Sequence, residues 1–304
     1  MLKKELLKIP LIKALADKER YWKSAFLYRY RYKETIEKTF EQRCGYKLNL
    51  DNPKAYNEKI QYLKIHWHDD LAVRCADKYE VRKYVEQSGY GDCLIPLIGL
   101  YKREKDIDFD SLPEKFALKA THGSGMNIIC TDKRKLDRKK ARKKIRIWLK
   151  QNYAYSSGER IYHGVQHRII CEKLLENKDG SAPCDYKIYC FSGVPRCVMV
   201  ASGRQAGKLC MDFFTPDWGR MPFKRHNPNS EIPPMKPEHL GDMLDMAAKL
   251  SAPFPHARID LYYVNGKIYF GEITFFPATG MQPFDPFEYD LLFGSWLDLE
   301  KVKR

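Results

Sequence analysis

Apolar and polar residues follow a helical spacing along the first 90 positions of the chain. Residues 75–92, CADKYEVRKYVEQSGYGD, place apolar positions among charges, and the Ser-Gly pair at 88–89 is expected to end this helix. The apolar run LIPLIGLY at 94–101 predicts a short buried strand, and the charged residues 102–115 predict a polar linker. We therefore expect a mainly helical N-terminal region.

Strands become the main expectation from Phe116 onward. Residues 116–131, FALKATHGSGMNIICT, predict a strand, a glycine-rich loop and a second strand. A basic helix and a strand at 169–175 follow, and the later residues predict mainly strands with one helix around 238–251. The chain is therefore expected to combine helices and strands in an α+β fold.

The composition excludes several classes of protein. With 304 residues and 44% hydrophobic content, the chain can bury a sizeable core and is expected to form two or three subdomains. Its nine cysteines contain no C-x-x-C pair, which indicates neither a zinc site nor a secreted disulfide framework and fits a reducing cytoplasm. No apolar run approaches the roughly 18 to 20 residues that span a bilayer, so a soluble or peripheral chain is expected.

The net charge of +15 is concentrated in one segment of the chain. Residues 133–150 hold eleven Lys or Arg against one Asp, and their apolar residues recur at helical spacing. Asp137 lies near the start of this predicted basic helix, where a negative charge interacts favourably with the helix dipole. Two interpretations stay open, namely a solvated face or a surface for anionic lipid, glycan or nucleic acid.

A second basic stretch, residues 1–40, carries eleven Lys or Arg against five acidic residues. Its large apolar side chains predict packing against the next domain, with contact to a membrane surface as the alternative. These side chains are Leu6, Leu7, Leu11, Leu15, Trp22 and Phe26.

The glycine-rich stretch at 121–125, THGSG, follows Lys119 closely. Glycines allow backbone N–H groups to converge on an anion, and a nearby lysine adds a positive charge. A Walker loop would join a strand to a helix, whereas residues 127–130 resume a strand at once. We therefore predict a β-hairpin whose tip folds over a triphosphate, with an ordinary surface turn as the alternative.

Residues 256–280, HARIDLYYVNGKIYFGEITFFPATG, predict two strands around the Asn-Gly turn at 265–266. A two-residue turn would put Asp260 opposite Gly271 and would place Glu272 on the other face of the hairpin. A three-residue loop would instead make Asp260 and Glu272 diagonal neighbours on one face. The length of the loop therefore decides whether the two carboxylates can act together.

We predict a hairpin whose loop or bulge places Asp260 and Glu272 on one face, and this arrangement predicts a metal site. The three-residue loop would place Arg258, Asp260, Glu272 and Thr274 on one face, with both carboxylates in reach of a common ion. Hard oxygen ligands suit Mg²⁺ that is bound jointly with nucleotide phosphates. The alternative is a solvent-facing salt bridge between Arg258 and Glu272, which the surrounding aromatic residues disfavour.

Several motifs together resemble those of the ATP-grasp enzymes. They are Lys119 before the glycine-rich hairpin, EKLL at 172–175, and RID at 258–260 followed by GEIT at 271–274. From NPKAYNEKIQYLK to the final hairpin, most of the chain resembles the TupA-like ATP-grasp family of bacterial surface-polysaccharide loci more closely. This resemblance implies an ATP-grasp fold in three parts. They are a mainly helical N-terminal region at 1–112, a small lid subdomain at 113–175, and a C-terminal antiparallel-sheet catalytic subdomain at 176–304.

The resemblance also implies roles for individual residues. Mg²⁺ would be bound by Asp260 and Glu272, with Thr274 where ATP-grasp enzymes commonly have Asn. The catalytic candidates are Arg258, which would face the transferring phosphoryl group, together with Lys119 and Lys187. The ATP-binding residues would be Lys78, Lys119, Gly123, Ser124 and Gly125 at the phosphates, Glu172, Lys173 and Leu175 at the adenine, and Asp185 at the ribose.

The activity implied by the resemblance is that of an ATP-dependent carboxylate ligase. Such an enzyme phosphorylates a carboxylate and joins it to an amine, and the lid excludes water from the acyl phosphate. The expected partners are ATP, an anionic sugar or glycan carboxylate, and an amine. We expect a cytoplasmic protein with peripheral contact at the inner face of the membrane.

Three alternatives to a ligase stay open. A glycosyltransferase would use an Asp-x-Asp metal motif, but the one at 106–108 lies in a charged stretch and is attributed to chance. A kinase of the ATP-grasp type would stop at phosphoryl transfer. A non-catalytic nucleic-acid binder would use the basic helix but would leave Asp260, Glu272 and the glycine-rich hairpin unexplained.

Overall fold

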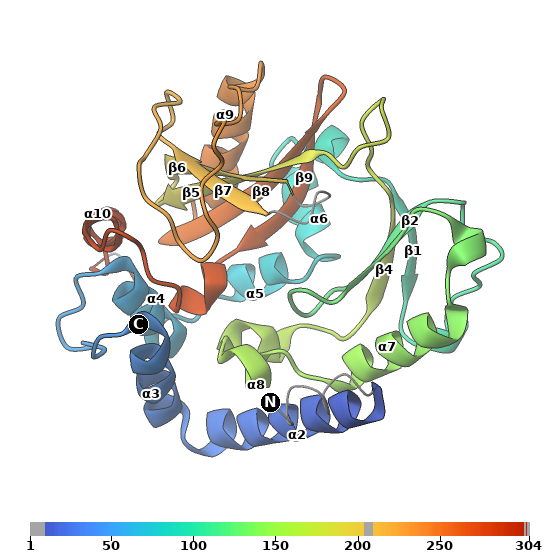
Figure 1. The fold of residues 1–304 in the computed structure, drawn as a ribbon, viewed down its shortest axis with the longest axis horizontal. Helices are drawn as coiled ribbons and strands as arrows, with labels where there is room; N and C mark the ends of the chain where they lie inside the picture. The colour runs from blue at the N-terminus through green and yellow to red at the C-terminus, as the bar shows by residue number, and fades with distance from the viewer. Residues whose placement is uncertain (1–9, 204–208, 301, 303–304) are drawn as a thin grey trace.

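The computed structural model describes residues 10–203, 209–300 and 302, in which helices surround two antiparallel sheets (Figure 1). The helices are α2 (Pro10–Tyr30), α3 (Tyr32–Cys44), α4 (Tyr56–His66), α5 (Asp70–Ala76), α6 (Val81–Gln87), α7 (Arg138–Lys150), α8 (Ala154–Ser157), α9 (Leu240–Ser251) and α10 (Glu288–Trp296). The strands are β1 (Leu97–Tyr101), β2 (Phe116–Ala120), β3 (Asn127–Cys130), β4 (Ile169–Lys173), β5 (Cys184–Phe191), β6 (Val194–Ser202), β7 (Cys210–Phe214), β8 (His256–Val264) and β9 (Lys267–Thr274). The predicted helical N-terminal region and the α+β composition are confirmed.

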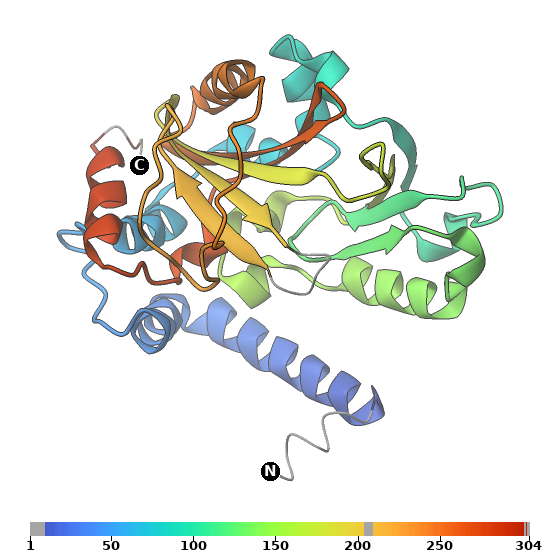
Figure 2. The same ribbon diagram turned by 45° about the horizontal axis from the view of Figure 1, so that its top comes forward.

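The smaller sheet has the strand order β1-β4-β2-β3, and the basic helix α7 lies along it (Figure 2). Ala141 and Ile145 on one side of α7 are buried in a core that includes Leu118 of β2. The carboxylate of Asp137 accepts the backbone N–H of Lys140 at 2.9 Å and so caps the start of the helix. The helix predicted from the basic segment is therefore confirmed.

Two predictions about the segment before this sheet are wrong. Ile95 in the run at 94–101 is buried, but β1 itself is not, because it is an edge strand with fewer covering neighbours, and Leu97 and Ile98 are exposed. Residues 102–115 are not only a polar linker, because the apolar side chains among them are buried in the core of the smaller sheet. Strand β1 joins this sheet although it precedes residue 113, and the three-part division of the chain stays a prediction.

The larger sheet has the strand order β7-β6-β5-β8-β9 and is covered on both faces. Successive side chains of a strand point to opposite faces. Tyr189 and Phe191 of β5 form ring contacts with Tyr56 of α4, whereas Cys190 between them reaches Ser251 of α9. Helices α4 and α10 therefore cover one end of the face that carries the odd-numbered residues of β5.

Helices α4 and α10 are held together by a buried polar contact and a close approach. The carboxylate of Asp290 accepts hydrogen bonds from the backbone N–H of Asn57 at 2.9 Å and from its side-chain Nδ2 at 2.7 Å. One turn further along α10, a Cβ atom on Gly294 would lie only 2.0 Å from the backbone oxygen of Lys54. Only glycine fits at this crossing without a shift of the backbone.

Helix α2 runs along one edge of the molecule, and one side of the helix faces the rest of the chain (Figure 1). Ser24 donates a hydrogen bond to the backbone oxygen of Tyr155 at 2.9 Å. Trp22 and Phe26 are 62% and 58% exposed, so the packing predicted for these two side chains is wrong. They lie on the side of the helix away from Ser24. Leu6 and Leu7 lie outside the described residues, and the side chains of Leu11 and Leu15 are not described either.

A helix that crosses a bilayer has to be both long and apolar. No helix in the described part of the chain meets both conditions, so none of them could cross a membrane.

We predict that Gly294→Ala destabilises the protein by about 1–3 kcal/mol, because the added methyl group overpacks the α4–α10 crossing. Thermal unfolding followed by circular dichroism would measure this change. The matched control is Gly241→Ala in α9, where an added Cβ meets nothing within 4 Å and should leave stability unchanged or raised. Equal melting temperatures for the two variants would contradict the prediction.

Candidate functional site

A polar cavity of about 250 Å³ lies between the two sheets. One wall comes from the glycine-rich hairpin and the smaller sheet, and the other from β5, β8 and β9. The cavity is lined by Lys78, Lys119, Ser124, Gly125, Met126, Asn127, Asp185, Lys187, Asp260, Tyr262, Gly271 and Glu272. Many of the residues singled out from the sequence therefore meet at one place.

The β8–β9 hairpin places its two carboxylates on one face, as predicted, but through a bulge rather than through a three-residue loop. Val264 pairs with Lys267, so the turn has two residues, and the predicted three-residue loop is wrong. The register shifts further along the hairpin, where Asp260 lies directly opposite Glu272 and Gly271 is the extra residue of a bulge. The two carboxylates therefore share one face as direct neighbours.

The bulge explains why residue 271 is a glycine. A Cβ atom there would lie 2.9 Å from the backbone oxygen of Asp260 and 3.1 Å from the ring of Tyr262. A side chain would thus push the two strands apart at the point where the carboxylates meet. The glycine before Glu272 in the GEIT motif is therefore needed so that the two strands can approach closely where Asp260 and Glu272 meet.

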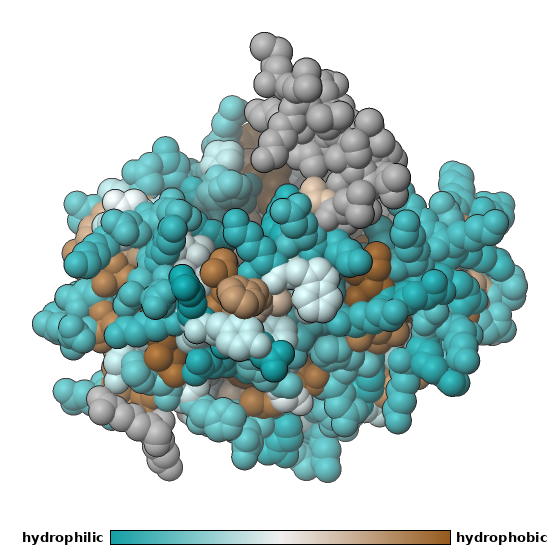
Figure 3. All heavy atoms as spheres, turned by 90° about the horizontal axis from the view of Figure 1, so that it is seen from below, coloured by the Kyte–Doolittle hydropathy of each residue, from teal (hydrophilic) through white to brown (hydrophobic). Residues whose placement is uncertain are grey.

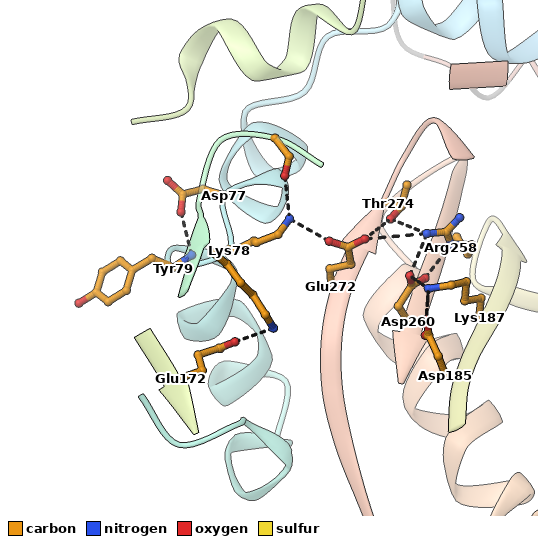
Figure 4. Close-up of polar contacts among 12 residues, drawn as sticks. Asp77, Lys78, Tyr79, Glu172, Asp185, Lys187, Arg258, Asp260, Glu272 and Thr274 are labelled. Carbon is orange, nitrogen blue, oxygen red and sulfur yellow. Dashed lines mark hydrogen bonds and ion pairs between the residues drawn. The ribbon is translucent and has the colours of Figure 1, made fainter. Parts of the chain in front are cut away.

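Asp260 is almost fully buried, at 1% exposure, and is held between two cations (Figure 4). Arg258 donates from Nε at 2.6 Å and from Nη2 at 2.8 Å to the two carboxylate oxygens. Lys187, which pairs with Asp260 across β5 and β8, donates to the same carboxylate and to Asp185 at 2.9 Å. Burial raises the pKa of Asp185, and the charge of Lys187 opposes this rise.

The predicted alternative, a solvent-facing salt bridge between Arg258 and Glu272, does not describe this arrangement. Nη2 of Arg258 lies 3.9 Å from Glu272, but its closer partner is the buried carboxylate of Asp260. Thr274 connects the two groups, because its hydroxyl accepts from Arg258 at 3.1 Å and donates to Glu272 at 3.3 Å. The four residues form one connected cluster.

Glu272 also joins this cluster to the glycine-rich loop. Nζ of Lys78 lies 2.8 Å from Glu272 and donates to the backbone oxygen of Gly123 at 3.1 Å (Figure 4). Burial alone would raise the pKa of Glu272, but Lys78 and Lys187 outweigh it and hold this pKa well below its ordinary value. Glu272 is therefore ionised at neutral pH.

The position of Lys78 is fixed by a buried ion pair that the sequence analysis missed. Asp77 accepts a hydrogen bond from the backbone N–H of Tyr79 at 2.8 Å and another from Arg168 at 2.8 Å. The backbone oxygen of Arg168 accepts from the N–H of Thr121, at the base of the glycine-rich loop, at 2.9 Å. One arginine therefore positions both Lys78 and the loop.

The loop itself joins β2 to β3, as predicted, and depends on glycine at two positions. A Cβ atom on Gly123 would lie 2.9 Å from the ring of Tyr153. Gly125 has a φ of +73°, a left-handed conformation that other residues rarely adopt. Tyr153 follows the basic helix in the chain, and no local pattern marks it as a neighbour of the loop.

Two stacked histidines attach the loop to the end of α7. The rings of His122 and His167 lie 4.0 Å apart, and one nitrogen of each ring contacts a backbone oxygen, that of Trp148 at 2.9 Å and that of Leu149 at 3.0 Å. Burial lowers the pKa of His122 to about 4, so this ring is neutral at neutral pH. The last turn of α7 and the loop are thus joined.

The residues predicted to contact adenine differ in their burial and in their contacts. Glu172 is buried and pairs with Lys119 at 2.8 Å and with Arg82 at 3.3 Å. Lys173 is exposed and Leu175 is half-buried, and neither lines the cavity formed by the described residues. Lys119 therefore lies at the cavity with a carboxylate partner, and the adenine contacts stay predictions.

The carboxylates can be tested for their fit to a metal ion. Among the described residues, no three His, Cys, Asp or Glu side chains lie close enough to hold a metal by themselves. Mg²⁺ is usually bound by one or two carboxylates together with substrate phosphates and water. Asp260 and Glu272 therefore fit one Mg²⁺ that is shared with phosphate oxygens, while a role for Thr274 as a ligand stays a prediction.

Comparison with known proteins supplies the family. A family model described as TupA-like ATPgrasp matches residues 58–298. No curated protein sequence matches the chain.

Several solved structures are similar in fold. D-alanine–D-alanine ligase from Helicobacter pylori has a TM-score of 0.44 at 12% identity and covers 83% of this chain and 68% of its own. The corresponding ligase from Bacillus anthracis has a TM-score of 0.41 at 15% identity, over 66% of this chain and 56% of its own. An L-amino acid ligase from Bacillus licheniformis has a TM-score of 0.39 at 14% identity, over 71% and 47%. The chain thus spans about half the length of the two Bacillus ligases.

The matched region begins within α4 and ends after α10, so it contains both sheets, the glycine-rich hairpin and the carboxylate pair. The resemblance and the ATP-grasp fold predicted from the sequence are confirmed. This chain belongs to the TupA-like ATP-grasp family.

Proposed function

We propose that the chain is an ATP-dependent carboxylate ligase that joins a carboxylate to an amine through an acyl phosphate. The observation that carries this proposal is the carboxylate pair Asp260 and Glu272, which faces Lys78 and the glycine-rich loop across one cavity. Phosphoryl transfer depends mainly on positioning and on neutralisation of charge. The family supports the same chemistry, since its description names the ATP-grasp fold.

The cations of the cavity would exchange one set of anions for another when ATP binds. Lys78 and Lys119 now contact Glu272 and Glu172, and both line the cavity, where they would contact phosphate oxygens instead. Arg258 would face the transferring phosphoryl group, and Lys187 lies beside it on the same carboxylate. When bound to Asp260 and Glu272, Mg²⁺ would neutralise charge on the phosphates. Ser124 and Gly125 at the loop tip would restrict access of water.

We further propose that the acceptor is a uronic acid or amino-acid component of a bacterial surface polysaccharide. The support is the resemblance to a family of surface-polysaccharide loci and the positive charge of the chain, +15, which favours an anionic substrate. A cytoplasmic location with peripheral contact at the inner membrane face belongs to the same proposal. Nucleic acid is not the proposed partner.

The proposal is tested by measuring ADP release while uronic acids are paired with amino acids or amines. A ligase should release ADP and phosphate only when both substrates are present, and mass spectrometry should find a product joined with loss of water. ADP release with a single acceptor and a stable phosphomonoester would instead identify a kinase. Transfer of a sugar without ADP formation would identify a glycosyltransferase.

We predict that Glu272→Gln removes the effect of Mg²⁺ on nucleotide binding. This substitution is preferable to Asp260→Asn, because loss of the Asp260 charge would leave Arg258 and Lys187 buried without their common partner. Loss of residues that only support a metal ligand costs about 10–100-fold in affinity, so loss of a direct ligand should cost at least about tenfold. Titration calorimetry with ATP, with and without Mg²⁺, would measure it.

The matched control for this experiment is Glu176→Gln. Glu176 forms an ion pair with Lys115 at 2.7 Å at the surface, so its substitution should leave the Mg²⁺ effect unchanged. A Glu272→Gln protein in which Mg²⁺ strengthens ATP binding as much as in the parent would rule out this carboxylate as a ligand.

We also predict that Lys119→Ala weakens binding of ATP at least about tenfold and leaves binding of adenosine nearly unchanged. Hydrogen bonds to charged groups contribute about 1.5–3 kcal/mol, and Lys119 is expected to contact phosphate rather than base. Glu172 keeps Arg82 as a partner in this variant, so the fold should be retained. Lys115→Ala is the control, because Lys115 lies at the surface just before the strand that carries Lys119. Equal losses for ATP and adenosine would show that Lys119 has only a structural role.

A further inference from the structure

Three aromatic side chains on α2 form an exposed stripe, which we call the aromatic stripe. Trp22, Phe26 and Tyr30 are 62%, 58% and 65% exposed. Their spacing of four residues places them on one side of the helix. The rings of Phe26 and Tyr30 lie 5.0 Å apart, so the stripe is continuous at that end. Figure 3 shows the side of the molecule along which α2 runs, where brown and pale side chains gather in the middle of a largely teal surface.

The opposite side of α2 holds the helix to the rest of the chain. The hydroxyl of Tyr21 accepts the backbone N–H of Asn152 at 2.9 Å, and Ser24 donates to the backbone oxygen of Tyr155. The ring of Tyr28 packs so closely on Gly158 that a Cβ atom there would lie 2.6 Å from it. The helix is therefore fixed in orientation, with the stripe directed outward.

Basic residues are concentrated on α2 and on the neighbouring helix α7. Helix α2 contains five basic and two acidic residues, and α7 contains eight basic residues and none that is acidic. The contact between Tyr21 and Asn152 places α2 beside the end of α7. Lys139, Lys140, Lys143 and Lys144 are exposed, and none of them forms an ion pair within the described part of the chain. Ile147, 44% exposed, adds an apolar side chain to the same side of α7.

We propose that the aromatic stripe and these four lysines form a binding face for a bilayer of anionic phospholipids. Aromatic side chains are stable at the boundary between headgroups and acyl chains, and lysines nearby are attracted to lipid phosphates. The bilayer is favoured over a second copy of the chain, because two such faces would bring many like charges together. It is favoured over single-stranded nucleic acid, which binds in grooves, whereas the stripe lies on the exposed side of one helix.

This inference names the residues and the lipid class of the membrane contact proposed above, and its test does not require ligase activity. The full chain is mixed with vesicles of phosphatidylcholine, with or without phosphatidylglycerol, and bound protein is measured by sedimentation. Binding should require phosphatidylglycerol and weaken as salt is added, because exposed charges are screened over about 8 Å at physiological ionic strength. A failed ligase assay would leave this result unaffected.

Two variants separate the contributions of the stripe and the lysines. Trp22→Ala with Phe26→Ala should weaken vesicle binding at least about tenfold through lost apolar burial. Replacing the four lysines by Gln should weaken binding and flatten its dependence on salt. The matched control is Ile232→Ala with Met235→Ala, which removes two side chains that are 87% and 89% exposed elsewhere on the molecule. This control should bind like the parent.

Fluorescence tests whether the stripe enters the bilayer. Trp22 is the one tryptophan of the five that is largely exposed, so brominated lipids should quench the parent and should quench Trp22→Phe much less. Vesicle binding that is unchanged in the double alanine variant would overturn the proposal. The proposal would also be overturned if the parent did not bind vesicles but formed a dimer or bound an oligonucleotide, and if the double alanine variant lost that dimer or that binding.

Discussion

The cavity depends on the buried ion pairs that the carboxylate of Asp260 forms with Arg258 and Lys187. Burial of charges costs free energy, and a buried ion pair seldom repays this cost in stability. The cluster is therefore better explained by a functional role than by a contribution to the stability of the fold. It joins charged side chains of β5 and β8, and the bulge at Gly271 adds Glu272 of β9 to them. Every other feature of the site is arranged around this fixed point.

The second wall of the cavity is attached to that point through Lys78. The ammonium group of Lys78 connects Glu272 with the backbone of the glycine-rich loop. Arg168 contacts Asp77, next to Lys78, and Thr121, at the base of the loop, and so positions both. These contacts link residues that are far apart in the chain. In the proposed function, the charged groups of the two sheets would already lie near the bound phosphates, which would lower the cost of ordering these groups on binding.

The sequence predicted the parts of this structure that local patterns determine. The strand–loop–strand at 116–131, the basic helix and the final hairpin were each visible in the spacing of apolar residues and in turn residues. The choice between a longer loop and a bulge in that hairpin was not, because the bulge depends on how closely the backbone of Asp260 approaches Gly271. The pairs Arg168–Asp77 and Lys119–Glu172 were also missed, since the partners lie 91 and 53 residues apart and no periodicity connects them.

The stacked histidines have a mechanical consequence for the glycine-rich loop. Because His122 and His167 join this loop to the last turn of α7, a movement of the loop would be transmitted to the helix. The four exposed lysines, Lys139, Lys140, Lys143 and Lys144, lie on this helix. A surface that binds those lysines would therefore also restrict the movement of the loop.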